Sequence, residues 1–99
     1  MINMENKLLA EISKMEKVHA KACEIFQHEG LSRDIRLEFK GKNWQYDDML
    51  KSLDTMKQMT DSEETKKNLV DQQLTVVRTR IEFELDIMKR AIAEIGAMA

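Results

Sequence analysis

The stretch Asp34-Ile-Arg-Leu-Glu-Phe-Lys-Gly-Lys-Asn-Trp-Gln-Tyr46 decides between an entirely helical fold and one that includes a small sheet. From residue 34 to residue 40, charged and apolar side chains alternate, which is typical of a half-buried strand. The sequence on both sides has apolar residues three and four apart, which is typical of helices. The same stretch contains the only tryptophan and the only tyrosine. It therefore combines the main structural ambiguity with the most distinctive side chains.

Two structures for residues 34–46 are open from the sequence. In a β-hairpin, the alternation would bury Ile35, Leu37 and Phe39 and turn the charged residues between them outward. In a helix capped by Ser32, Ile35 and Phe39 would share one face and Leu37 would be left off that face, free for a partner. The helix is slightly favoured because the neighbouring segments are helical.

The rest of the chain has the apolar spacing of helices. A first helix is predicted over residues 4–29, with Gly30 as a left-handed C-terminal cap. A second helix is predicted over about 46–59, and Thr-x-x-Glu at 60–63 predicts a capping box that starts a third. The third helix would be about 50 Å long at 1.5 Å per residue. It carries two apolar stripes, more than one neighbouring helix covers.

Composition favours a helical bundle. The chain has 99 residues, which fits a single helical domain over residues 1–99. It contains no proline, 34% charged residues and only 5% aromatic residues, and this balance is typical of helical bundles. We predict an all-α fold, either a three-helix bundle or a helical hairpin with a long C-terminal helix. A small β-hairpin at 34–46 is the alternative within it.

Charge and cysteine content restrict the classes of function. The net charge of -2 is too small to predict a polyanionic partner, although residues 31–46 form the only segment with more cations than carboxylates. Cys23 is the only cysteine, which excludes an intrachain disulfide and gives no sign of an oxidising compartment. We expect no secretory signal and no membrane-spanning run. These features predict a cytoplasmic protein with no membrane partner.

Two residue pairs on the first predicted helix are candidates for chemistry. Glu16 and His19 have the Glu-x-x-His spacing of ferritin-like metal sites, with Glu84 as the one inward carboxylate expected on the long helix. Cys23 follows His19 by four residues, but a helix face offers neither an orienting group nor an oxyanion pocket. We therefore expect a structural histidine and a buried thiol. The chain is predicted to be no enzyme and to hold no cofactor or metal, and the Glu16/His19 metal site is kept as a second alternative.

The basic and aromatic segment is the predicted binding element. We predict a non-enzymatic protein–protein interaction module, such as an adaptor, chaperone or inhibitor, that contacts another protein through this segment. The first alternative is a small nucleic-acid-binding protein that uses residues 33–46, with phosphates on the cations and bases on the rings. The expected partner-binding residues are Arg36, Phe39, Lys40, Lys42, Trp44 and Tyr46.

The C-terminal half of the long helix is the predicted surface for self-association. A lone domain of this size buries only about 60–65% of the surface that its unfolded chain exposes, so a homo-oligomer would gain buried apolar area. The expected contact residues are Phe83, Leu85, Ile87, Met88, Ile92 and Ile95.

Overall fold

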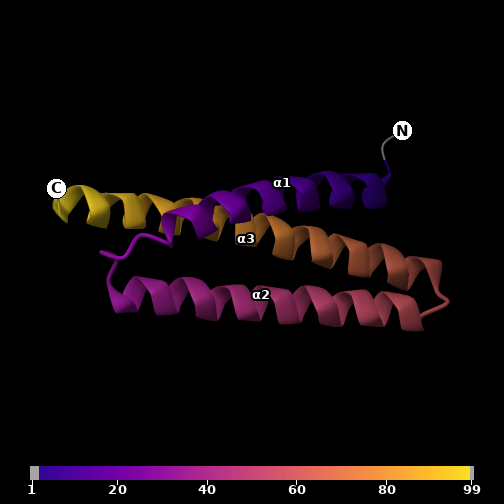
Figure 1. Ribbon diagram of the computed structural model, residues 1–99. Coiled ribbons are helices and arrows are strands. Elements are labelled where there is room, and N and C mark those ends of the chain that lie inside the picture. Colours follow the sequence, from indigo (N-terminus) through magenta and orange to yellow (C-terminus); the bar gives the residue numbers. More distant parts are fainter. Residues whose placement is uncertain (1–2, 99) are drawn as a thin grey trace.

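Three α-helices make up the fold, and each runs antiparallel to the next in the chain (Figure 1). A computed structural model describes residues 3–98: helix α1 covers Met4–Ile25, α2 covers Arg33–Met59 and α3 covers Glu63–Met98. No strand occurs within those described residues. The all-α prediction is confirmed in its three-helix form. Within the same range, no helix is long and apolar enough to cross a membrane.

Residues 34–46 lie inside α2. The predicted cap is confirmed, because the Ser32 hydroxyl accepts a hydrogen bond from the Ile35 amide at 3.4 Å. Ile35 and Tyr46 are buried, whereas Leu37 is 54% exposed. The hairpin alternative is therefore wrong, and so is the predicted start of this helix near residue 46. A lone hairpin is only marginally stable, whereas a continuous helix pairs its own amides and presents one buried stripe to α3.

Helix α1 ends at Ile25, earlier than the predicted end at residue 29. No glycine among the described residues has a positive φ, so the left-handed cap predicted at Gly30 does not form. The connection to α2 is held instead by Arg36, which donates to the carbonyls of Leu31 and His28. Leu31 is itself buried. A side chain of the following helix thus pairs two carbonyls of this connection.

The start of α3 is capped two residues later than the predicted capping box, by Ser62 instead of Thr60. The Ser62 hydroxyl accepts from the Thr65 amide at 3.2 Å, and the Thr60 hydroxyl accepts from the Ser62 amide at 3.3 Å. Glu63 is the first residue of the helix rather than the partner of a Thr60 cap. The predicted position of this boundary is confirmed, but its cap is Ser62, because Thr60 is used to form the turn before it.

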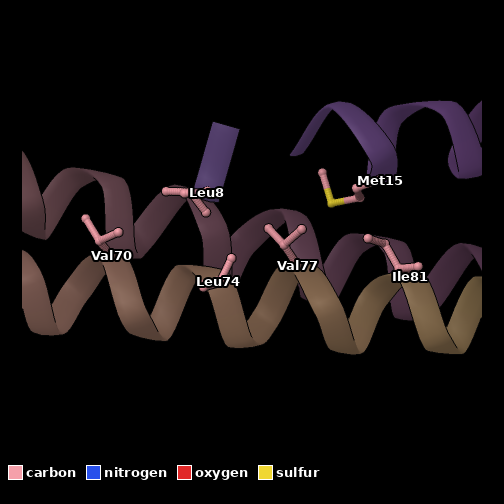
Figure 2. Close-up of a cluster of buried hydrophobic side chains, with 6 residues drawn as sticks. All are labelled: Leu8, Met15, Val70, Leu74, Val77 and Ile81. Atoms are coloured by element: carbon pink, nitrogen blue, oxygen red, sulfur yellow. The ribbon is translucent and has the colours of Figure 1, made fainter. Parts of the chain in front are cut away.

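Helix α3 is the central element, since α1 and α2 each pack along it. Figure 2 shows Leu8 and Met15 of α1 directed at a row of side chains on α3. Val77 in the middle of this row has no exposed surface. The row recurs every three or four residues, as one face of a helix requires. It consists of Val70, Leu74, Val77 and Ile81.

A second core cluster lies toward the C-terminal end of α3. Ile87 and Ala91 are fully buried there against Leu31 of the α1–α2 connection and Ile35 of α2. The two apolar stripes of α3 are thus covered within one chain, by α1 and by α2. Within residues 3–98, α1 and α2 make no close backbone contact with each other. The backbone spans 55 × 26 × 14 Å.

Candidate functional site

A groove of about 430 Å³ lies between α1 and α2, where their backbones stand apart. We call it the α1–α2 groove. Both helices contribute side chains to it at helical spacing, so each presents one face. The lining residues are His19, Cys23, Phe26, Arg36, Phe39, Lys40, Asn43, Trp44 and Asp47.

Stacked rings form the apolar wall of the groove. The rings of Phe26 and Phe39 are parallel within 8°, with their centroids 4.2 Å apart, and the His19 ring also stacks on Phe39, with centroids 6.0 Å apart. These contacts join α1 to α2 although the two backbones do not meet. Offset ring pairs of this kind contribute about 0.5–1.5 kcal/mol beyond the area they bury. The wall is therefore a preformed surface.

Trp44 stands at the rim of the groove and is 66% exposed. The Lys40 ammonium lies 5.7 Å from the centre of its ring, within cation–π distance. Leu37, which the helical alternative leaves for a partner, is also exposed on α2. The rim thus presents a cation and an aromatic ring to solvent.

The other predicted partner-binding residues have different positions. Lys42 is exposed, and Phe39 is half-buried in the stacked wall. Arg36 lines the groove, but its guanidinium is bonded to two carbonyls of the α1–α2 connection. Tyr46 is only 8% exposed and packs on Phe83 of α3 with ring centroids 6.0 Å apart. Tyr46 therefore belongs to the core and lies apart from the exposed rim.

Polar side chains that line the groove contact two buried ionic groups of α3. His19 Nδ1 lies 2.6 Å from Glu84 Oε1. Arg80, one turn earlier on α3, donates to Asp47 at 2.8 Å and to Asn43 at 2.6 Å. Glu84, Arg80 and Asn43 are nearly inaccessible to solvent. This connected set of side chains, His19, Glu84, Arg80, Asn43 and Asp47, is named the polar network below.

Two atoms of the polar network lack a partner in the described part of the chain. They are Arg80 Nε and Glu84 Oε2, both buried. Arg80 Nε lies 3.7 Å from the other oxygen of Glu84, so the two charges compensate each other without a hydrogen bond. Removing one of these two ions would leave the other uncompensated, and an uncompensated buried charge destabilises a fold by several kcal/mol. The network therefore constrains how the three helices fit together.

Cys23 extends this arrangement toward the groove. Its Sγ lies 3.4 Å from Nε2 of His19, so thiol, imidazole and carboxylate follow one another in space. From the sequence, no group was expected to orient His19 as the base of a nucleophilic cysteine. The structure corrects this expectation, because Glu84 of α3 contacts the other nitrogen of the His19 ring. Burial, and then the negative charge of Glu84, raise the pKa of the Cys23 thiol. A nucleophilic cysteine needs the opposite shift, so this geometry favours a structural thiol.

The proposed metal ligands do not come together. Glu16 is exposed, whereas the predicted inward carboxylate Glu84 does meet His19. Among the described residues, no group of three or more histidine, cysteine, aspartate or glutamate side chains is arranged to hold a metal ion. Sequence analysis missed Arg80 and Asn43. Their one signal is that each falls on a buried stripe of its helix.

The predicted self-association residues are divided between core and surface. Ile87 is fully buried, and Phe83 and Ile95 pack on its cluster. Leu85 and Ile92 are 43% and 56% exposed. Met88 is half-buried. Only part of the predicted surface is therefore available to a second copy.

Comparisons of the chain with protein-family models, with curated proteins and with solved structures find no match.

Proposed function

We propose that the protein is a non-enzymatic interaction module that binds an acidic, partly apolar segment of another protein in the α1–α2 groove. The observation that carries the proposal is the exposure of Trp44, the only tryptophan, at the rim of a groove with a stacked aromatic wall. Tryptophan is among the residues that dominate binding energy at protein interfaces. Covering it removes a large apolar area from water.

The charges of the groove define the chemistry of the partner. Lys40 stands beside the Trp44 ring, and Arg36 lines the same groove. The one carboxylate in the lining, Asp47, is already paired with Arg80. The uncompensated charge is therefore positive, and complementary charge favours a carboxylate-bearing partner. Its apolar side chains would lie between Trp44 and the Phe26–Phe39 pair.

Nucleic acid is the less favoured partner for this surface. Single-strand binders stack successive bases on several exposed rings. In residues 33–46 only Trp44 is an exposed ring, because Tyr46 faces α3 and Phe39 is half-covered. One ring and a few cations suit a protein segment better. We also propose a cytoplasmic setting, which suits the free thiol of Cys23.

Affinity capture from an extract of the source cells tests the proposal. Three baits are compared: the natural chain, Trp44→Ala, and Leu9→Ala as a matched control, since Leu9 is 62% exposed on α1 and lines none of the grooves described here. We expect a protein that binds the natural chain and Leu9→Ala and is lost from Trp44→Ala. Equal capture by all three baits, or capture that is abolished by nuclease, would contradict the proposal.

A further inference from the structure

A second groove, of about 540 Å³, lies between α2 and α3. It is on the opposite side of α2 from the Lys40 rim: Lys40 and Met49 are nine residues apart, which is two and a half helical turns. We call it the methionine groove. Its lining includes Asp48, Met49, Leu53, Met56, Asp71 and Val76.

The methionine groove has an apolar and adaptable floor. Met49 and Met56 are 45% and 48% exposed, so their thioethers face solvent from one side of α2. Leu53 is buried between them and Val76 of α3 is half-buried opposite. Unbranched methionine side chains repack at low cost around an incoming apolar surface. The floor can therefore accept aliphatic side chains of varied shape.

The charge of this groove is opposite to that of the α1–α2 groove. Asp48 of α2 and Asp71 of α3 lie in its lining, and no lysine or arginine does. Neither carboxylate belongs to an ion pair with any side chain in residues 3–98. Two carboxylates without cations beside an apolar floor complement a ligand that carries both cations and aliphatic groups.

We propose that the methionine groove binds a basic amphipathic helix of a partner protein. A helix is favoured over an extended segment because its backbone groups are already paired, whereas the walls of this groove are helices with no free edge to pair an extended chain. The lining runs from residue 48 to residue 56 of α2, which is about two helical turns. A ligand helix lying along it would place lysines or arginines near Asp48 and Asp71.

A second copy of this chain fits the groove less well. None of its helices is strongly basic, since the cations and carboxylates number four and four in α1, six and five in α2, and six and seven in α3. The proposal goes beyond the function assigned to the α1–α2 groove. With surfaces of opposite charge on two sides of α2, one molecule would hold two unlike partners at once.

The test uses a synthetic peptide of leucine and lysine, patterned as an amphipathic helix about four turns long. The control peptide has glutamate in place of lysine. The protein carries ¹³C-labelled methionine methyl groups, and binding is followed by their NMR signals. We expect the lysine peptide to shift the signals of Met49 and Met56 and to leave that of Met15, in the α1–α3 core, unchanged.

Substitutions test whether the peptide binds in the methionine groove or only through general attraction between charges. We expect Asp48→Asn with Asp71→Asn to weaken binding about tenfold, from the loss of two partly exposed ion pairs. Met49→Ser with Met56→Ser should weaken it at least as much, whereas Trp44→Ala should leave it unchanged; helicity confirms that each variant is folded.

Equal binding of the glutamate peptide would overturn the proposal. So would unshifted Met49 and Met56 signals, equal loss in Trp44→Ala, or signals that change with protein concentration alone, which would mean a second copy fills the groove.

Discussion

His19 of α1 and Glu84 of α3 are 65 residues apart in the chain, and their side chains meet with Nδ1 2.6 Å from Oε1. Glu84 is fully buried, and Arg80 on the same helix connects it to Asn43 and Asp47 of α2. Through Arg80, this carboxylate thus links all three helices. These contacts hold three residues that line the α1–α2 groove: His19, Asn43 and Asp47.

Replacing Glu84 by alanine is expected to destabilise the fold by about 3 kcal/mol. The substitution leaves the buried Arg80 guanidinium without the carboxylate that compensates its charge, and His19 without its Nδ1 partner. Chemical denaturation measures the change in free energy of unfolding. Glu82→Ala is the matched control, because Glu82 is exposed on the same helix and should change stability by less than about 0.5 kcal/mol. Equal effects of the two substitutions would show that the polar network does not hold the helices together.

Ile87 and Ile92 provide a second matched pair. Ile87 has no exposed surface and belongs to the second core cluster, whereas Ile92 is 56% exposed. Ile87→Ala should cost about 2–5 kcal/mol, from lost burial and the cavity left behind. Ile92→Ala should cost well under about 1 kcal/mol. Thermal unfolding of both variants checks the packing, and a reversed order of melting temperatures would refute it.

Stability is expected to fall at alkaline pH. Burial raises the pKa values of the Cys23 thiol and the Tyr46 phenol above their ordinary values of 9.0 and 10.0. Above pH 9 the unfolded chain releases these protons while the folded chain keeps them, so the free energy of unfolding decreases as pH rises. Denaturation at neutral pH and above pH 10 measures the loss. The double variant Cys23→Ala, Tyr46→Phe should lose less stability over this interval, and an identical loss would contradict the assignment.

Self-association through α3 remains a prediction, now restricted to its exposed residues. Leu85 and Ile92 retain apolar surface, whereas Ile87 is used within the chain. If copies associate there, Leu85→Ser with Ile92→Ser should lower the mass measured by light scattering and leave helicity unchanged. If the measured mass does not change, the contact between copies lies outside this part of α3.

The sequence predicted the helical stripes because they repeat locally, and it predicted Glu84 as inward for the same reason. It missed the partners of Arg80, since Asn43 lies 37 residues away and no local pattern connects them. The segment 34–46 was ambiguous because its alternation fits a strand, whereas the choice depends on packing against α3. Tertiary contacts decided it.

The choice between strand and helix decides whether Trp44 and Tyr46 lie on the same face. Two residues apart, they would share a face of a strand, but on a helix they point about 200° apart. Tyr46 is therefore buried against Phe83, and Trp44 is left in solvent. Sequence analysis grouped both as binding residues, and the helix separates them. Only Trp44 and its neighbour Lys40 form the exposed rim.

The most direct test of the central claim is photo-crosslinking in the source cells, from a photoreactive amino acid placed at position 40 or, as a control, at position 93. Lys40 borders the α1–α2 groove beside Trp44, whereas Ala93 is exposed on α3 and lines none of the grooves described here. We predict a crosslinked partner protein from position 40 that disappears when Trp44→Ala is added, and none from position 93. The same products from both positions, or a product from position 40 that survives Trp44→Ala, would contradict binding through this groove.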